Sequence, residues 1–221
     1  MHESHHNVLH QNEFARKPLL IQQNLPLKRH FFKNEKIIDT GIKHGTVSII
    51  KDHEAIEVTT FRIDGEYSDN RHPECVSFTR NLNEDLKRRD FTVNTLAYSE
   101  KTGLIDLCDG LSDIENKIIR TVGDAETRFN EDGLRIMRAL RFASTLGFTI
   151  EEKTKQAIHK QKELLRNISV ERISIELNKL LLGKNVFDIL TEFSDVFAVI
   201  IPEIEPCINF KQYGKKHAYD V

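Results

Sequence analysis

The chain has 221 residues, 39% hydrophobic and 30% charged, which is enough for one or two globular domains. Its formal net charge of −2 gives no overall attraction to nucleic acid, so any such binding must come from local basic patches. Three widely spaced cysteines argue against a disulfide framework or a zinc site. No apolar run approaches the roughly 18 residues of a membrane span, and no signal-peptide core is present, so we expect a cytoplasmic protein without membrane contact.

Residues 1–36 show no regular pattern. The first ten residues include four histidines, which either bind a metal or, as we expect, belong to a solvated, disordered tail. From Phe14 to Lys36, apolar and basic residues mix without a period, and Pro18 and Pro26 interrupt them. We therefore predict no stable element in this segment.

Two β-strands are predicted next. Residues 37–50 end in a β-rich run, and a polar turn separates this run from a second strand at residues 55–63. Alternation places Glu57 on the same face as Phe61 and Ile63. A carboxylate on such a half-apolar face has a partner or a metal, or else lies on an edge strand. Both explanations stay open at this point.

A loop and a helix are predicted after these strands. Residues 64–74 are polar and contain Gly and Pro, which is typical of a loop. Residues 82–99 are predicted to form a helix that includes Arg89, Asp90 and Asn94. The basic residues of this segment are either simply exposed or, together with Asp90 and Asn94, suited to phosphate and sugar contacts.

The rest of the chain is predicted to be mainly helical. The expected elements are a strand at 103–107, a helix at 111–116, an extended piece at 118–122, and helices at 125–146, 151–165, 170–182, 185–193 and 195–201. Gly147 and Gly183 stand where helix C-caps are expected. The fold class is therefore α+β: a small head with strands, then an all-helical part, with the boundary near residue 123.

Residues 130–143 read N-E-D-G-L-R-I-M-R-A-L-R-F-A and predict an amphipathic helix. Asn130 is the expected N-cap, and Glu131 and Asp132 suit the positive end of the helix dipole. At about 100° per residue, the polar face carries Asp132, Arg135, Arg138 and Arg141. The opposite, core-facing side carries Ile136, Met137, Leu140 and Ala143. Leu134 and Phe142 intrude on the polar side, which indicates a second contact there.

Three arginines beside a single carboxylate should repel one another unless something anionic lies across them. One interpretation is a solvated basic face. The other is a nucleoside triphosphate site, because guanidinium groups suit phosphate oxygens and a fixed Asp–Arg pair can match a base edge. The helix alone does not decide between them.

Several segments together resemble one enzyme family. They read I-D-T-G-I-K-H-G-T-V (38–47), E-V-T-T-F-R (57–62), K-R-R-D-F-T-V-N-T-L-A-Y (87–98), G-L-I-D-L-C-D-G (103–110), R-F-N-E-D-G-L-R-I-M-R-A-L-R-F-A (128–143) and V-E-R-I-S-I-E-L-N-K-L-L (170–181). In this order they resemble the motifs of class II tRNA nucleotidyltransferases, the CCA-adding enzymes, which share head and neck with bacterial poly(A) polymerases. The resemblance implies a nucleotidyltransferase-like head with a small mixed sheet at 37–123, a helical neck at 124–205, and the start of a tRNA-binding body at 206–221.

The resemblance also implies a reaction and its partners. The family adds CCA to the 3′ end of tRNA from CTP and ATP, by in-line displacement with two Mg²⁺ ions at the reacting oxygens. Glu57 resembles the third carboxylate of the catalytic, metal-holding cluster. No protein partner is implied.

The nucleotide site is implied by the same resemblance. Asp132 and Arg135 would read the Watson–Crick edge of the incoming base. The phosphates and sugar would be held by Arg89, Arg138 and Arg141. The pocket would be shaped by Asp90 and Asn94.

The sequence departs from the family pattern at both ends. The family's head opens with G-G-x-V-R-D and a D-x-D metal-binding pair, whereas residues 16–36 contain one acid, Glu35. We therefore expect residues 1–36 to be frameshifted or disordered, and the chain to be a fragment with impaired activity. A poly(A) polymerase and a non-catalytic nucleotide- or RNA-binding remnant are the alternatives.

Overall fold

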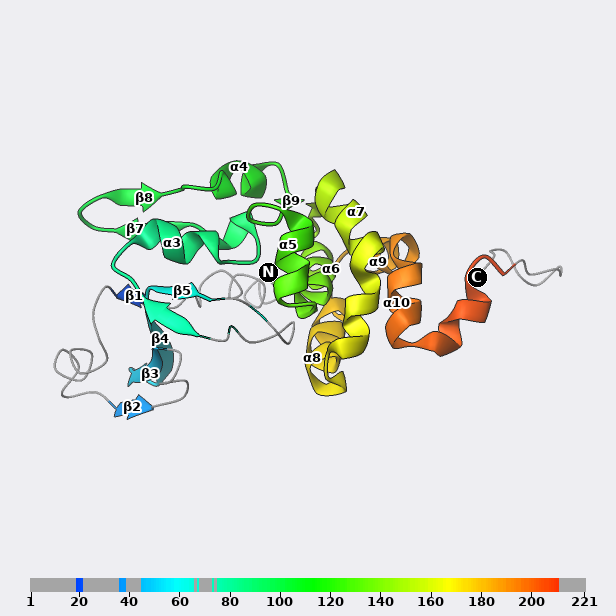
Figure 1. Ribbon diagram of the computed structural model, residues 1–221, viewed down its shortest axis with the longest axis horizontal. Helices are drawn as coiled ribbons and strands as arrows, with labels where there is room; N and C mark the ends of the chain where they lie inside the picture. Colours follow the sequence, from blue (N-terminus) through cyan, green and yellow to red (C-terminus); the bar gives the residue numbers. More distant parts are fainter. Residues whose placement is uncertain are drawn as a thin grey trace, which may run out of the picture. The chain divides into compact units, whose positions relative to one another are not determined.

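The computed structural model describes residues 19–21, 36–38, 45–65, 67, 73 and 75–210 (Figure 1). The chain divides into two compact units, which are described here one at a time. The first consists of the described residues of Met1–Gly65 and Cys75–Asp85, and the second of those of Glu66–Glu74 and Leu86–Val221. The interpretations of the histidine-rich N-terminus and of residues beyond 210 lie outside the described ranges.

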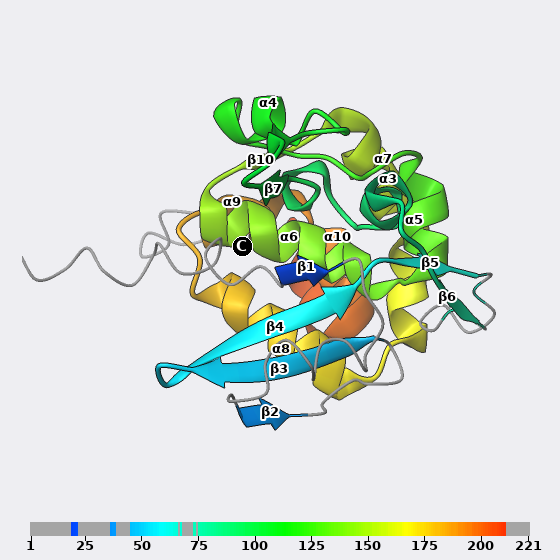
Figure 2. The same ribbon diagram turned by 90° about the vertical axis from the view of Figure 1, so that its left-hand side faces the viewer.

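The first unit is built on a four-stranded sheet of order β1-β4-β3-β2. Strands β3 (Thr46–Lys51) and β4 (Glu54–Thr60) form an antiparallel hairpin, drawn as the two long arrows in Figure 2. On either side, β2 (Lys36–Ile38) lies antiparallel to β3, and β1 (Leu19–Ile21) lies parallel to β4. Strand β1 falls in the segment for which no element was predicted.

The second predicted strand is shorter than expected. Strand β4 ends at Thr60, and β5 (Arg62–Asp64) then pairs with β6 (Val76–Phe78) in a separate two-stranded sheet. The main-chain N–H of Arg62 donates to the Asp85 carboxylate at 3.2 Å, which helps to hold the chain after β4. The prediction that Glu57, Phe61 and Ile63 share one strand face is therefore wrong.

The second unit is mainly helical. Its elements are η2 (Thr92–Asn94), β7 (Ala97–Ser99), β8 (Gly103–Ile105), α4 (Gly110–Glu115), β9 (Ile118–Ile119), α5 (Ala125–Glu131), α6 (Leu134–Leu146), β10 (Thr149–Ile150), α7 (Glu152–Gln161), η3 (Lys162–Asn167), α8 (Val170–Leu181), α9 (Val186–Glu192), α10 (Ser194–Ile200) and η4 (Pro202–Cys207). Helix α3 (Leu82–Lys87) runs from the first unit into the second. No helix within the described ranges is long and apolar enough to cross a membrane.

Helix α6 lies at the centre of the second unit. Its apolar residues Ile136, Met137, Leu140 and Ala143 are all completely buried, which confirms the predicted core-facing side. It packs against α8 and α9 (Figure 1). Because these four side chains belong to the main hydrophobic cluster, their burial contributes to the stability of the unit.

The two predicted C-cap glycines differ in role. Gly147 caps α6 in the left-handed region, with φ of 67°. The cap residue of α8 is instead Leu182, and Gly183 follows it. A Cβ atom on Gly183 would collide with Ser144 of α6, so this glycine is required by close packing between helices rather than by its backbone conformation.

The predicted helix over 125–146 is broken into α5 and α6. Asp132 is extended, with φ −145° and ψ 105°, and Gly133 precedes the first turn of α6. A Cβ on Gly133 would lie 3.1 Å from the Leu164 side chain, so the linker passes close to the segment after α7. Asn130 therefore lies in the last turn of α5, and the prediction that it caps a helix is wrong.

The predicted helix over 82–99 is also wrong beyond Lys87. Phe91 is extended and forms a bridge with Thr121, and the Thr92 N–H donates to the Arg120 carbonyl at 2.9 Å. These long-range bonds satisfy backbone groups that a helix would otherwise use. Phe91 and Val93 are completely buried in the main core, and the burial of these apolar side chains favours the extended conformation over a helix.

This packing bears on where the chain divides. Phe91, Val93 and Ile119 belong to the same core as α6, so the compact second unit includes the chain from Leu86 onward, on both sides of residue 123. The functional ranges 37–123 and 124–205 stay a prediction.

A core truncation tests the central position of α6. Leu140→Ala should lower the free energy of unfolding by about 2–5 kcal/mol, because it leaves a cavity at a completely buried position. Urea titration followed by circular dichroism measures the change. Leu182→Ala is the matched control, since that side chain is 84% exposed and its loss should cost far less. Equal costs for both variants would contradict this packing.

Candidate functional site

The three arginines of α6 are all paired with protein carboxylates. Arg138 donates to Asp90, with Nε 2.9 Å from Oδ2, and its Nη1 lies 3.5 Å from Glu176. Arg141 donates from Nε to the second oxygen of Glu176 at 2.9 Å. Arg135 pairs with Glu131 at 2.5 Å. The arginines are thus neutralised without any bound anion, and the expectation of a single nearby carboxylate is wrong.

The three arginines of α6 differ in how far they are exposed to solvent. Arg135 and Arg141 are buried, with 8% and 6% of the residue exposed, so the interpretation as a solvated basic face is also wrong. The side chain of Arg138 is 31% exposed. Within the α6 arginines, Arg138 is therefore the most accessible to a ligand in solution.

Asp90 is the carboxylate on which this arrangement depends. It follows α3, where the chain has left the helix, and it is 8% exposed. Its Oδ1 accepts the Phe91 N–H and the Asn94 side-chain amide, both at 2.9 Å. Burial raises the pKa of Asp90, but Arg138, Asn94 and the Phe91 N–H outweigh it and lower the pKa from 3.8 to about 2.

Arg89 belongs to the same group. Its Nη1 donates to the main-chain carbonyl of Asn94 at 2.8 Å. Burial lowers the pKa of Arg138, but the charge and hydrogen bond of Asp90, together with the nearby charges of Glu176 and Asp132, outweigh it, so this pKa is raised overall. The structure thus brings Arg89, Asp90, Asn94 and Arg138 together, whereas their roles toward a nucleotide stay a prediction.

Asp132 and Arg135 do not form the expected side-chain pair. Asp132 is bound by Arg172 of α8, whose Nη2 lies 2.9 Å from Oδ2, and its Oδ1 accepts the Leu134 N–H at 3.1 Å. Besides Glu131, Arg135 donates to the carbonyl of Arg128 at 2.9 Å. The two side chains start from neighbouring positions but are held by different partners.

An aromatic ring supports the arginine side of α6. The Arg141 guanidinium carbon lies 3.6 Å from the centre of the Phe142 ring, and that of Arg138 lies 5.5 Å away. Phe142 in turn meets Phe91 edge to face at 5.7 Å. The position of Phe142 on the polar side of the helix predicted a second contact there, and its packing against Arg141 and Phe91 confirms that prediction.

Three of these partners were missing from the predicted site: Glu131, Arg172 and Glu176. The last two lie four residues apart on α8, which places them near one another along the helix. Glu176 is 6% exposed and lies between the apolar residues Ile173 and Leu180 on the buried side. An acid within an apolar stripe was the available signal, because such a residue needs a partner in the fold.

Glu57 lies in the first unit, on the sheet face away from the small core. Its cross-strand partner is Ser48, whereas Val47 and Val58 pair on the opposite, buried face. Strand β1 pairs only with Val58–Thr60 of β4, so at Glu57 the strand is paired on the β3 side alone, and the explanation by an edge position fits. Glu57 itself is exposed.

The described residues offer few ligands for the Mg²⁺ ions that the family resemblance implies. Among the described residues, no group of three or more His, Cys, Asp or Glu side chains could hold a metal ion. A pair of Mg²⁺ ions needs several carboxylate oxygens, and Glu57 alone does not provide them. The described side chains therefore do not fit a metal pair.

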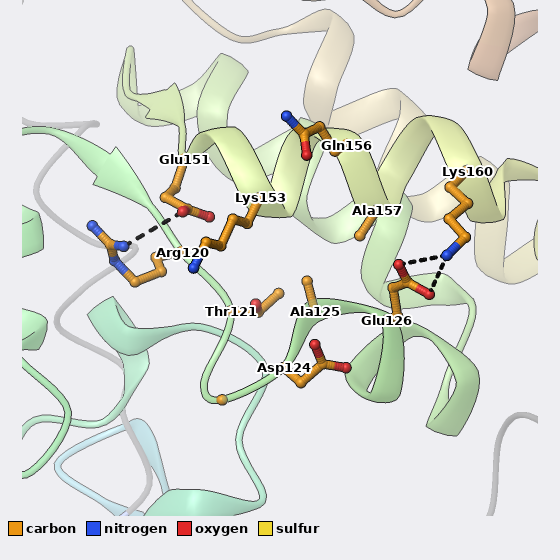
Figure 3. A pocket seen from close by; sticks show the side chains of 11 residues that line it. Arg120, Thr121, Asp124, Ala125, Glu126, Glu151, Lys153, Gln156, Ala157 and Lys160 are labelled. Atoms are coloured by element: carbon orange, nitrogen blue, oxygen red, sulfur yellow. Dashed lines mark hydrogen bonds and ion pairs between the residues drawn. The ribbon is translucent and has the colours of Figure 1, made fainter.

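A cavity of about 650 Å³ lies elsewhere in the second unit, between α5 and α7 (Figure 3). It is lined by Arg120, Thr121, Gly123, Asp124, Ala125, Glu126, Glu151, Lys153, Gln156, Ala157 and Lys160. Its wall already pairs charges, with Lys160 bound to Glu126 at 2.8 Å and Arg120 to Glu151 at 3.6 Å. None of the predicted site residues lines it.

Two family models match the chain. Residues 21–120 match the model described as the poly A polymerase head domain, and residues 147–208 match the one described as a probable RNA and SrmB-binding site of polymerase A. Together with the mixed sheet and the helical second unit, they define the class of protein: one built from a head domain of the poly A polymerase type and a helical neck.

Relatives give the family. The chain is 57% identical over 155 residues to the CCA-adding enzyme of Pediococcus pentosaceus, covering 70% of this chain and 39% of that one. It is 52% identical over 177 residues to that of Lactobacillus delbrueckii subsp. bulgaricus, covering 80% and 44%. The chain belongs to the family of class II tRNA nucleotidyltransferases and bacterial poly(A) polymerases. It spans less than half the length of these curated relatives.

Solved structures agree. The Bacillus stearothermophilus CCA-adding enzyme in complex with CTP is 48% identical, with a TM-score of 0.66, over 72% of this chain and 38% of that one. A tRNA nucleotidyltransferase complexed with a primer tRNA and an incoming ATP analogue is 26% identical, with a TM-score of 0.63, over 89% and 55%.

The depressed pKa of Asp90 predicts a pH-dependent stability. Ionised Asp90 stabilises the folded protein fully above about pH 4, and this contribution is lost as the pH falls toward the folded pKa of about 2. Asp90→Asn should therefore lower the free energy of unfolding by about 2 kcal/mol at pH 6, and this difference should shrink between pH 4 and pH 2. Urea titrations at several pH values measure it. Asp188→Asn, at an exposed position of α9, is the control; a pH-independent cost of Asp90→Asn would contradict the ion pair.

Proposed function

We propose that this chain carries the nucleotide-selecting part of a tRNA nucleotidyltransferase that adds CCA to tRNA 3′ ends from CTP and ATP. One observation carries the proposal. A single helix, α6, places three arginines directly after Asp132, in a chain more than half identical over 155 residues to a CCA-adding enzyme. The substrates named for the solved relatives, CTP, an ATP analogue and primer tRNA, are of the same kind.

Base selection is proposed for Asp132 and Arg135. A carboxylate accepts from the amino group of cytosine or adenine, whereas uracil and guanine present a carbonyl oxygen at that position. An arginine can donate to the neighbouring ring acceptors. Arg135 is bound by Glu131 and by the Arg128 carbonyl, so we propose that these bonds fix the direction of its remaining donors.

Phosphate and sugar binding is proposed for Arg89, Arg138 and Arg141, with Asp90 and Asn94 shaping the pocket. Arg138 is the most exposed of the α6 arginines and suits direct contact with phosphate oxygens. Arg141 is buried against Phe142 and bound to Glu176, so we propose that it supports the phosphate site from a position that also holds α8 against α6.

The family's requirement for a divalent ion stands apart from these roles. Glu57 is proposed as a ligand of Mg²⁺, but the described side chains do not complete a metal pair. No reaction step is therefore assigned to a metal here. The proposed partners, tRNA and nucleoside triphosphates, favour a cytoplasmic protein.

Two other functions have specific support. The matched head model is named after poly A polymerase, which would extend RNA with ATP alone. The lack of a three-ligand acidic group among the described residues favours a nucleotide-binding protein without catalysis. Incubation with tRNA lacking its CCA end separates the three: addition of C and then A supports the proposal, and extension by ATP alone supports the polymerase. CTP binding without extension supports the non-catalytic reading.

Substitutions at α6 test the division of roles. Asp132→Ala should reduce the preference for CTP over UTP, and for ATP over GTP, by about tenfold or more, because one base-reading bond is worth roughly 1–3 kcal/mol. Arg138→Ala should weaken all four nucleotides alike, by about 1.5–3 kcal/mol, as expected for a charged hydrogen bond to phosphate. Isothermal calorimetry measures both. An equal loss for all four nucleotides in Asp132→Ala would contradict base reading.

A further inference from the structure

Arg172 occupies a position that the proposed roles do not use. It lies in the first turn of α8 and reaches the extended linker between α5 and α6. There its Nη2 donates to both oxygens of Asp132, at 2.9 Å and 3.3 Å. Both side chains are largely covered, with 23% of Arg172 and 18% of Asp132 exposed.

Asp132 is therefore held from two directions. The Leu134 N–H binds Oδ1 from the start of α6, and Arg172 binds from α8. Two bonds from separate elements fix both the position and the rotation of a carboxylate, whereas the N–H alone leaves it free to turn. The second lone pair of Oδ2 remains available as an acceptor.

The guanidinium group of Arg172 also has a donor that makes no hydrogen bond within the described residues. Its Nη1 is buried and has no hydrogen-bond partner among the residues that the structure describes. Buried donors without an acceptor are uncommon in folded proteins. An acceptor supplied by a ligand beside Asp132 would satisfy it.

We propose that Arg172 is a positioning residue for base selection, which holds the Asp132 carboxylate so that it accepts only from bases with an amino group. This inference rests on the proposed function of Asp132. The discrimination comes from geometry. A fixed carboxylate oxygen meets the amino group of cytosine or adenine, and it repels the carbonyl oxygen of uracil or guanine at the same place. A carboxylate that can turn away loses much of that repulsion.

Arg172 is not needed to hold the helices together. Helices α6 and α8 are also joined by Arg141 and Glu176 at 2.9 Å, and by the Ser144 hydroxyl, which donates to the Leu180 carbonyl at 2.7 Å. Leu180 itself is completely buried. Removing Arg172 should therefore leave the fold intact while it releases Asp132.

The test compares nucleotide binding by the full chain and by Arg172→Met, which keeps the length of the side chain but loses its donors. Calorimetry with CTP, UTP, ATP and GTP gives four dissociation constants for each protein. We expect the CTP-over-UTP and ATP-over-GTP ratios to fall about tenfold, with a smaller change in the mean affinity. Arg172→Lys retains one charged donor and should restore part of the ratio.

Controls separate the possible failures. Arg166→Met removes an exposed arginine that pairs only with Glu163 among the described contacts, and it should leave both ratios unchanged. In Asp132→Ala, adding Arg172→Met should cause no further loss, since the residue that Arg172 positions is gone. If the unsubstituted chain binds no nucleotide, the proposed function fails. If it prefers CTP and ATP and Arg172→Met keeps that preference, the role of Arg172 is overturned. A uniform fourfold loss across all nucleotides would likewise overturn it.

Discussion

The second unit depends on the pairing of buried arginines with carboxylates from other elements. A guanidinium group that is less than a tenth exposed, as in Arg135 and Arg141, loses its hydration and must regain that free energy from a partner. Arg141 forms an ion pair with Glu176 of α8, and Arg138 forms one with Asp90 in the segment after α3. Since these partners come from separate parts of the chain, their bonds to α6 set the relative positions of three elements.

This pairing has a functional consequence. The charged side chains around α6 are oriented by protein partners, so the nucleotide binding proposed above would not have to order them. A triphosphate would meet Arg138 already directed by Asp90, and a base would meet Asp132 already directed by Arg172. The same bonds limit what can bind, because a ligand must add to the existing contacts or compete with them. Selectivity in such a site is a property of the carboxylate partners as much as of the arginines.

Much of the fold was predictable because it follows from local periodicity. The apolar side of α6, the hairpin of β3 and β4, and the left-handed cap at Gly147 were all expected from short stretches of sequence. The two helices that were predicted too long have a common cause. Residues 88–99 have helical periodicity, yet Asp90 and Thr92 bond through their backbones to Val122 and Arg120, and Ala97–Ser99 pair with Gly103–Ile105. The break at Asp132 lies where the linker passes close to the segment after α7. Such contacts override local preference and leave no local signal.

The sequence by itself determined the class of protein, the amphipathic nature of α6, and the identity of its polar residues, because motif order and helical period lie in contiguous residues. Only the tertiary structure decided which charges pair. Arg138 meets Asp90 across 48 positions, Asp132 meets Arg172 across 40, and Arg141 meets Glu176 across 35. A residue's charge is written in the sequence, whereas its partner depends on how distant elements pack, and for these arginines the partner determines how each one can act.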